Sequence, residues 1–204
     1  MLDQTRFYRL LDALLPRAGA PWDDGCTPHI HLVLFVHRVE GLAPGLYALP
    51  RSTAGERQLR AALSSSFTWA GVDDAPAQLP LYLLLRQDLA GIARMMNCRQ
   101  AIAADGAFAL AMLAEFEPVL RPAPWRYRDL YREAGQLGQA LYLEAEAAGM
   151  RGTGIGCFID DDCHTLLGLA DRSFQSLYHF TVGAPLMDAR IVSLPPYPPP
   201  DANQ

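Results

Sequence analysis

The stretch from Gly149 to His164, GMRGTGIGCFIDDDCH, carries most of the residue types in this chain that could do chemistry. It contains four glycines, two cysteines and three consecutive aspartates. Such a stretch could form a phosphate-binding loop, a metal site, a redox pair, or only a turn between a helix and a strand. The spacing of its residues and the elements on either side of it help to choose among these possibilities.

The glycines do not match the two common phosphate-binding loops. A dinucleotide-binding loop follows a strand and opens a helix, whereas here a long predicted helix comes first and a strand-like segment follows. A Walker loop requires a lysine, and all 17 basic residues of the chain are arginines. What remains is a glycine-rich bend, Gly152–Cys157, whose bare backbone could press its N–H groups against a flat ligand with polar edges.

The cysteines and aspartates of this stretch do not indicate a metal site or a redox pair. Cys157 and Cys163 lie six residues apart, unlike the CxxC spacing of such pairs. The aspartates precede a predicted helix over 163–169, so we interpret them as caps for the free N–H groups at its start. Four scattered cysteines in a chain of this length are typical of reduced thiols, which predicts a cytoplasmic protein. These cysteines are Cys26, Cys98, Cys157 and Cys163.

Two further candidates lie outside this stretch. His29 and His31 share one face of a predicted strand and would suit a metal ion, but no third ligand is evident. Glu133, in the long predicted helix, could be an acid or a base, although a surface charge on a helix is the ordinary interpretation. No GxSxG or other nucleophile motif is present.

The composition predicts one globular domain. Half of the 204 residues are hydrophobic, 19% are charged and the formal net charge is −5, so the chain can bury a core without metals or disulfides. The arginines form no basic patch, which argues against nucleic-acid binding. No apolar run is long enough to cross a membrane. We expect a domain over 1–185 and a Pro-rich arm over 186–204, which cannot be helical because prolines remove backbone donors.

Helices and strands are interleaved without strict βαβ regularity, which favours a mixed α/β or α+β domain. The longest helix is predicted over 126–149, and Gly149 is suited to end it. Its internal Gly135 and Gly138 either allow a close approach to the backbone or are small residues tolerated in a crowded core. Segment 106–117 fits a helix by its Ala and Leu content and a doubly buried strand by its continuous apolarity. The other predicted elements are helices over 4–15, 56–63 and 89–97 and strands over 29–39, 46–50, 79–86 and 174–183.

Three segments, in their order along the chain, resemble the flavin-dependent nitroreductase superfamily and, within it, the SagB-type (thiazoline/oxazoline dehydrogenase-like) branch. Each segment alone is a weak match, and the three together are specific. They are HRVEGLAPGLYAL at 37–49, YREAGQLGQALYLEAEAAGMRGTGIGCFIDDDCHTLLGL at 131–169 and HFTVGAPLMDARIVSLPPY at 179–197.

The resemblance implies an α+β, nitroreductase-like fold with a mainly antiparallel sheet flanked by helices, a long central helix and an extended C-terminal arm. It also implies FMN held at the interface of a homodimer, or of two sister domains in one chain. By position, Ile155, Gly156 and Cys157 would meet the flavin ring with a backbone N–H reaching toward N5, and Gly154 would permit the close approach. Arg190 matches a basic position that the family uses near the FMN phosphate.

The chain departs from the family pattern at its start. The family's Arg-Arg-Ser motif, which grips the FMN phosphate, has no counterpart in residues 1–20, and the Ser-Ala-Gly-Ala loop is replaced by GCTPHI at 25–30. Thr27 in that loop could offer a hydroxyl near the ring edge. The resemblance therefore indicates the second domain of a tandem protein, or a shortened relative.

Two functions follow from the resemblance. The first is ping-pong hydride transfer through FMN, with azoline rings in peptides or a small molecule as the substrate. The second is a non-catalytic partner or scaffold domain, which would keep the fold and the pairing surface and bind flavin weakly.

Overall fold

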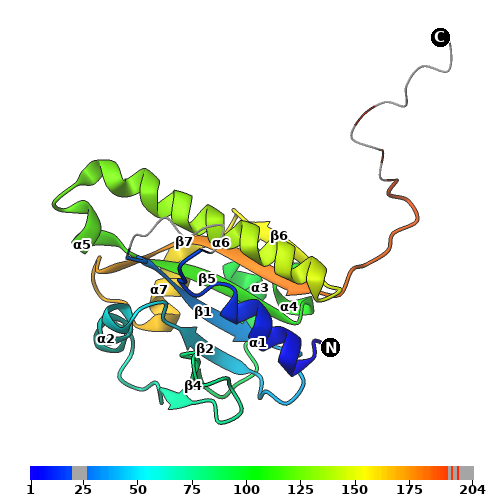
Figure 1. Cartoon of the computed structure of the whole chain (residues 1–204), viewed down its shortest axis with the longest axis horizontal. Helices are drawn as coiled ribbons and strands as arrows, with labels where there is room; N and C mark the ends of the chain where they lie inside the picture. The colour runs from blue at the N-terminus through cyan, green and yellow to red at the C-terminus, as the bar shows by residue number, and fades with distance from the viewer. Residues whose placement is uncertain (20–26, 193, 195–196, 198–204) are drawn as a thin grey trace.

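The structure, a computed structural model, describes residues 1–19, 27–192, 194 and 197. Seven strands form one sheet in the order β3-β4-β2-β1-β5-β7-β6, and all neighbouring strands are antiparallel. Helices pack on both faces of this sheet (Figure 1). The expected α+β architecture, an antiparallel sheet flanked by helices, is confirmed.

The predicted elements are present with small shifts of their ends, and the short elements β3, α4, α5 and η1 were not predicted. The strands are β1 (Ile30–Val36), β2 (Gly45–Leu49), β3 (Ala70–Gly71), β4 (Tyr82–Leu85), β5 (Phe108–Glu115), β6 (Arg151–Ile155) and β7 (Phe174–Gly183). The helices are α1 (Gln4–Asp12), α2 (Thr53–Ala62), α3 (Ala90–Met96), α4 (Ile102–Asp105), α5 (Phe116–Leu120), the 3₁₀ turn η1 (Pro124–Arg126), α6 (Tyr127–Ala147) and α7 (Asp160–Leu167).

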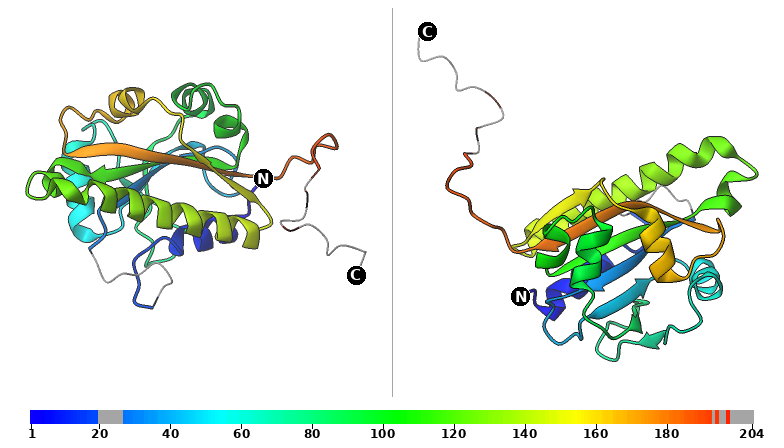
Figure 2. Two further views of the ribbon diagram at one scale, coloured as in Figure 1. Left: turned by 90° about the horizontal axis from the view of Figure 1, so that it is seen from above. Right: turned by 180° about the vertical axis from the view of Figure 1, so that it is seen from behind.

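Each face of the sheet has its own hydrophobic core, because alternate side chains of a strand point to opposite faces. Leu32 and Leu34 of β1 belong to the core that contains the apolar sides of α1 and α6. Val33 and Phe35 belong to the core that contains buried residues of α2, α3, α4 and α7. Seen from above, the sheet lies edge-on between these two helical layers (Figure 2).

Segment 106–117, which fitted either a helix or a strand, contains the central strand β5. Its eight residues are all buried, and it is paired with β1 on one side and β7 on the other. A strand covered by helices on both faces needs no polar face, which explains its continuous apolarity. The tertiary position therefore overrode the helix propensity of its Ala and Leu residues.

The glycine-rich stretch is mostly a strand, so the prediction of a bend over Gly152–Cys157 was wrong for its first four residues. Residues 151–155 form β6, which pairs with β7 from Arg151↔Gly183 to Ile155↔His179. The bend is confined to the four residues between β6 and α7. A sequence rich in glycine carries little strand propensity, and here the free edge of β7 supplies the pairing that makes it a strand.

Aromatic side chains account for two of the glycines in β6. A Cβ at Gly152 would lie 2.7 Å from the Phe180 ring, and one at Gly154 would lie 1.7 Å from the Tyr178 hydroxyl oxygen. The hydroxyl of Tyr142, from α6, accepts a hydrogen bond of 2.8 Å from the Gly154 N–H. These contacts place aromatic rings over one face of β6 and connect β6 to α6 through the Tyr142 hydroxyl.

The glycines of the long helix α6 have different surroundings. A Cβ at Gly138 would lie 3.0 Å from the Tyr178 ring, whereas the same position at Gly135 is open. Close approach therefore explains Gly138 and does not explain Gly135. Gly149 follows the helix in the left-handed region, with φ of 71°, as a helix-ending glycine does.

Helix α7 begins at Asp160, three residues earlier than predicted, so the aspartates form its first turn. The N-cap position is occupied by Ile159, which makes no capping side-chain bond, while the Asp160 carboxylate accepts a hydrogen bond of 3.2 Å from the Asp161 N–H. Acidic groups in a first turn still interact favourably with the helix dipole. The prediction was therefore wrong about where the helix begins, while one aspartate does bond a first-turn N–H group.

The chain beyond β7 leaves the body at Gly183 as an extended segment, visible in orange in both figures (Figures 1 and 2). The domain boundary at 185 stays a prediction. Among the described residues, no helix is both long and apolar enough to cross a membrane.

The Gly154 contact predicts a specific loss of stability. Gly154→Ala should lower the free energy of unfolding by about 1–3 kcal/mol, because the added methyl overlaps the Tyr178 hydroxyl. Gly156→Ala is the matched control, since no atom lies within 4 Å of its Cβ position, and it should change stability by less than about 0.5 kcal/mol. Urea unfolding measures both. Equal effects would show that Tyr178 does not constrain β6.

Candidate functional site

The turn after β6 presents open backbone beside a cavity. Ile155 is 2% exposed and anchors the end of the strand in the core, whereas Gly156 is exposed, with no atom within 4 Å of its Cβ position. A cavity of about 360 Å³ lies next to Gly156. Its lining residues are Phe116, Tyr127, Tyr131, Gly156, Phe158, Asp160, Arg172, Gln175, Ser176 and Leu177.

The cavity wall is largely aromatic and carries phenol groups. The Tyr127 hydroxyl donates to the Tyr131 hydroxyl at 3.3 Å. Burial, followed by this contact with Tyr127, raises the pKa of Tyr131 to about 12. The phenol is therefore protonated at neutral pH and offers an O–H group to a ligand. In the lining of the same cavity, Asp160 accepts a hydrogen bond of 2.8 Å from the Gln175 amide.

A buried polar chain supports the turn from below. His179 of β7 is 1% exposed; its Nδ1 lies 2.8 Å from the Asn97 amide oxygen and its Nε2 lies 2.9 Å from the Ser176 hydroxyl. Burial lowers the pKa of His179 to about 3, so the ring is neutral in the physiological range. Phe158 stacks on this ring at 4.1 Å between centroids. The residues after Gly156 therefore lie on a rigid, uncharged base.

The segment between α3 and α4 clamps the same turn from the side. The Ile159 N–H donates to the Met96 carbonyl at 2.8 Å, and the Gln100 amide donates to the Cys157 carbonyl at 3.1 Å. Cys98 and Cys157 form a disulfide, with their Cα atoms 5.9 Å apart. The expectation that all cysteines are reduced was therefore wrong for this pair, because residues 59 apart in sequence meet only in the folded chain.

The remaining cysteines of the chain are Cys163 and Cys26. Cys163 is a free, fully buried thiol whose pKa is raised to about 12, mainly by burial. Cys26 lies outside the described residues.

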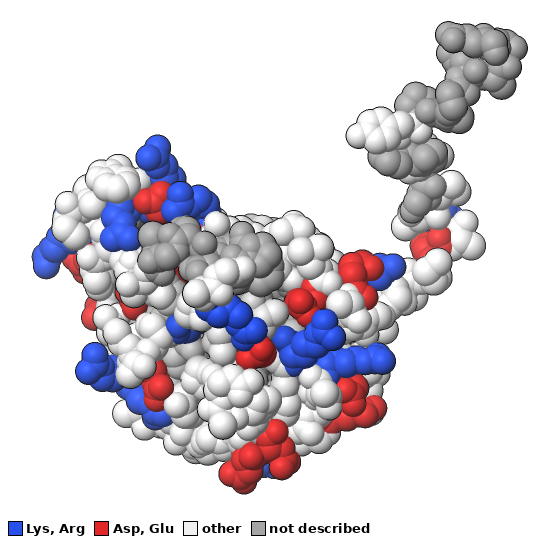
Figure 3. All heavy atoms as spheres, viewed as in Figure 1, with Lys and Arg blue, Asp and Glu red and all other residues white. Residues whose placement is uncertain are grey.

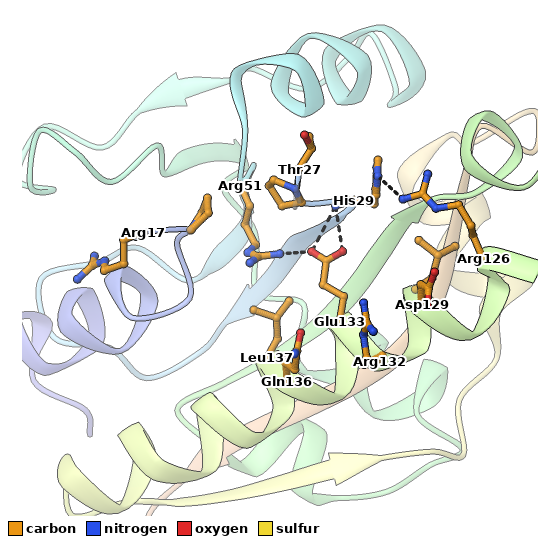
Figure 4. A pocket seen from close by; sticks show the side chains of 13 residues that line it. Arg17, Thr27, His29, Arg51, Arg126, Asp129, Arg132, Glu133, Gln136 and Leu137 are labelled. Atoms are coloured by element: carbon orange, nitrogen blue, oxygen red, sulfur yellow. Dashed lines mark hydrogen bonds and ion pairs between the residues drawn. The ribbon is translucent and has the colours of Figure 1, made fainter. Parts of the chain in front are cut away.

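A second cavity, of about 100 Å³, lies along the N-terminal half of α6 and is lined by four arginines (Figure 4). Two acidic residues also line this cavity. Figure 3 shows basic side chains over α5 and the start of α6, with acidic side chains among them. The charged lining residues are Arg17, Arg51, Arg126, Arg132, Asp129 and Glu133.

Glu133 is the centre of this second cavity and is not an ordinary helical surface charge. Its carboxylate forms an ion pair with Arg51 and accepts hydrogen bonds from the N–H groups of His29 at 3.0 Å and Ile30 at 3.2 Å. Figure 4 shows Arg51 and the start of β1 converging on it from two sides. It therefore supplies the hydrogen-bond acceptors for the backbone N–H groups at the start of β1, and it neutralises the charge of the buried Arg51.

The two histidines of β1 share one carboxylate instead of facing a common metal position. His29 Nδ1 lies 2.8 Å and His31 Nε2 lies 3.2 Å from the two oxygens of Glu115, which is 7% exposed. Burial alone would raise the pKa of Glu115. Hydrogen bonds from both rings and their charges outweigh it and lower that pKa to about 2. Within the described residues, no group of three His, Cys, Asp or Glu side chains is arranged to hold a metal ion.

The structure brings four of the five predicted site residues together. Gly154, Ile155, Gly156 and Cys157 are consecutive, from the end of β6 into the turn. Arg190 lies on the extended segment that leaves β7 at Gly183, the end paired with Arg151 and not with Ile155. Its side chain is 89% exposed and bonded to Asp188. Thr27 lines the second cavity, away from the lining of the cavity beside Gly156.

Three features of the site could not be found from the sequence. They are the Arg51–Glu133 ion pair, the shared Glu115 and the Cys98–Cys157 disulfide, each joining residues at least 59 positions apart. The one available signal was the pair of same-face histidines, which indicated a shared partner but not its identity.

The family model for nitroreductases, described as "Nitroreductase family", matches residues 44–184. The chain belongs to the nitroreductase family. The match spans β2 to the end of β7, so it includes the turn at Gly156 and most of both core layers. No curated protein matches the chain.

Solved structures agree with the nitroreductase fold at low identity. A protein of Anabaena variabilis ATCC 29413 described as a nitroreductase has a TM-score of 0.65 at 20% identity over 91% of this chain and 34% of that one. A chain of the E. coli microcin synthetase McbBCD complex, with truncated pro-MccB17 bound, has a TM-score of 0.61 at 16% identity, covering 92% and 65%. Nitroreductase A of Vibrio parahaemolyticus has 0.55 at 14% identity, covering 92% and 61%. This chain thus spans about a third of the Anabaena protein and less than two thirds of the other two.

The shared carboxylate predicts a pH-dependent stability difference. Glu115→Gln should lower the free energy of unfolding by about 2–3 kcal/mol at pH 7, because the native carboxylate has a depressed pKa. As pH falls from about 5 to about 2, the unfolded state takes up the proton first. The wild type then loses this contribution, and the difference between the two proteins should shrink.

Urea unfolding at several pH values measures this difference. Glu117→Gln is the matched control, because the Glu117 side chain is 49% exposed and its carboxylate oxygen lies 3.8 Å from the nearest guanidinium nitrogen of the exposed Arg121. A difference between the wild type and Glu115→Gln that stays constant from pH 7 to pH 2 would contradict the role given to Glu115.

Proposed function

We propose that this chain is an FMN-dependent oxidoreductase of the nitroreductase family, with the flavin ring lying against the turn at Gly156. The observation that carries the proposal is the open backbone at Gly156, beside an aromatic cavity of about 360 Å³. This turn lies within the matched part of the family model. We expect Gly154, Ile155, Gly156 and Cys157 to form the floor of the site.

The residues present suit a flavin ring in three respects. A glycine without any neighbour at its Cβ position leaves room for a flat group to approach the backbone. The Tyr127, Tyr131 and Phe158 rings offer apolar surface for a planar heterocycle. The Tyr131 phenol stays protonated at neutral pH and can donate to a polar ring edge.

When bound, FMN would supply hydride transfer at N5, in a ping-pong sequence with two substrates. The chain's part is to bind, orient and exclude water. A backbone N–H of residues 155–157 would donate toward the ring and favour its electron-rich form. The neutral His179 under Phe158 keeps the base of the site free of a positive charge that would vary with pH.

The phosphate of FMN would be held by Arg190, supplied across a dimer interface. The extended segment presents large apolar side chains to water, between 73% and 92% exposed. Such a surface favours association with another subunit. We propose a homodimer, or pairing with a sister domain, that buries more than about 2,000 Å² in total. These side chains are Leu186, Met187, Ile191, Val192, Leu194 and Tyr197.

We propose a substrate in the class suggested by the SagB-type resemblance: an azoline ring within a peptide, or a small molecule. The structural likeness to a chain of a microcin synthetase complex with truncated pro-MccB17 bound supports the peptide alternative. The non-catalytic partner domain remains the second candidate function, because the Arg-Arg-Ser motif has no counterpart in residues 1–20. A cytoplasmic location remains a prediction.

The turn at Gly156 provides the direct test of the flavin site. Gly156→Val should lower the fraction of protein that retains flavin by about tenfold or more, because the side chain would occupy the space of the ring. The far-UV CD spectrum should stay unchanged, since the substitution meets no atom of the chain.

Absorbance of the purified protein measures flavin retention. Gly71→Val is the matched control, because Gly71 is an exposed strand residue with equally open space at its Cβ position. Equal flavin content in both variants would place the ring elsewhere. A wild type that binds no flavin would favour the partner-domain function.

The Arg190 assignment predicts selective loss of FMN over riboflavin, which lacks the phosphate. Arg190→Ala should weaken FMN binding about tenfold to a hundredfold, the usual effect of losing one charge-assisted contact, and should change riboflavin binding little. Arg151→Ala, another exposed arginine with a carboxylate partner, is the control. Calorimetric titration of both ligands measures the effects, and equal losses for both would remove Arg190 from the phosphate site.

A further inference from the structure

The Cys98–Cys157 disulfide lies beside the proposed flavin turn, and the proposed hydride-transfer chemistry does not use it. It joins the residue after Gly156 to the segment between α3 and α4. Both of its cysteines are exposed. A chain of this size with two extensive cores does not need a disulfide in order to fold. An exposed disulfide on a surface turn is the kind that exchanges with external thiols.

The two segments stay together without the covalent bond. The Ile159 N–H to Met96 carbonyl bond and the Gln100 amide to Cys157 carbonyl bond connect them on either side of the disulfide. The Asn97 side chain is also held in the core by His179. Opening the disulfide therefore leaves the two sulfur atoms near each other, which is the condition for a pair that opens and closes reversibly.

The surroundings of Cys98 favour its departure as a thiolate. Arg99 follows it, and the Arg94 guanidinium donates to the Arg99 carbonyl at 3.3 Å, so the segment that carries Cys98 also carries two basic residues. Neighbouring positive charge stabilises a thiolate and makes it a better leaving group. Cys163 differs, because it is fully buried and belongs to the core.

We propose that Cys98–Cys157 is a site of thiol–disulfide exchange with an external dithiol, and that its oxidation state sets the mobility of the turn at Gly156. A thiolate of the dithiol attacks the Cys157 sulfur, the disulfide bond breaks and Cys98 leaves as a thiolate. The second thiol of the reagent then attacks the mixed disulfide and releases Cys157. The chain gains two electrons and two protons, and the dithiol becomes a disulfide.

Reduction of the disulfide changes how residue 157 is held in the turn. In the oxidised state, residue 157 is fixed by the covalent bond and by the Gln100 hydrogen bond. In the reduced state only the hydrogen bonds hold it, so local opening of residues 156–158 becomes easier. The exchange half of this inference stands independently, while an effect on flavin binding rests on the proposed function.

The test uses the full chain carrying Cys26→Ser, equilibrated with oxidised or reduced dithiothreitol as the probe. Native protein is alkylated and the added groups are counted by mass. We expect no accessible thiol in the oxidised buffer, two in the reduced buffer, and a return to none on reoxidation, all with an unchanged far-UV CD spectrum. Two accessible thiols in the oxidised buffer, or reduction only after unfolding, would overturn the exchange site.

Hydrogen exchange of the backbone tests the effect on the turn. Reduction should speed exchange of the Ile159 amide, which donates to the Met96 carbonyl, on the order of tenfold and leave the β1 and β5 amides unchanged. The Cys98→Ser/Cys157→Ser variant should exchange like the reduced protein in both buffers, and Cys163→Ala should respond like the parent. Equal exchange in the two oxidation states would overturn the control of the turn.

FMN titration of both oxidation states separates this inference from the proposed function. Tighter binding by the oxidised protein would support the link between the disulfide and the flavin site. Failure of both states to bind would count against the flavin site alone, because the thiol counts and the amide exchange are measured without a ligand.

Discussion

Burial of the central strands on both faces is the constraint on which the rest of the structure depends. β1, β2 and β5 have no exposed residue, so two layers of helices must cover them. The alternation of side chains along β1 divides its apolar residues between two cores. Each helix is held by one of these cores. The edge strand β6 is then added to β7 at a fixed register, and this places the turn at Gly156 at the surface.

Polar groups enter this apolar framework where β1 begins, and their partners come from distant elements. Glu133 reaches from α6 to the β1 backbone and to Arg51, and Glu115 at the end of β5 binds both histidines of β1. Each charge that the sheet buries is thereby hydrogen-bonded, as buried charges must be. The result ties α6, β1, β5 and the loop before α2 together at one end of the sheet.

The turn at Gly156 combines an open surface with a rigid base. Its exposed side is bare backbone next to aromatic rings, while beneath it the neutral His179 and Asn97 fill the core. The segment between α3 and α4 attaches to the turn by two hydrogen bonds and a disulfide. Rigid support under an exposed, side-chain-free surface is what close binding of a planar group requires.

The sequence by itself determined the fold class, most of the elements and the position of the candidate turn. These predictions used local properties that can be recognised in the sequence alone: the strong periodicity of the long helix, the apolar strands and the three family-like segments. The tertiary structure alone decided that 106–117 contains a strand and that glycine-rich 151–155 pairs with β7. It alone decided the partners of Glu133, Glu115 and Cys98. The reason is physical: edge pairing, ion pairs and disulfides join residues far apart in the chain, and their energies depend on distances that no local pattern encodes.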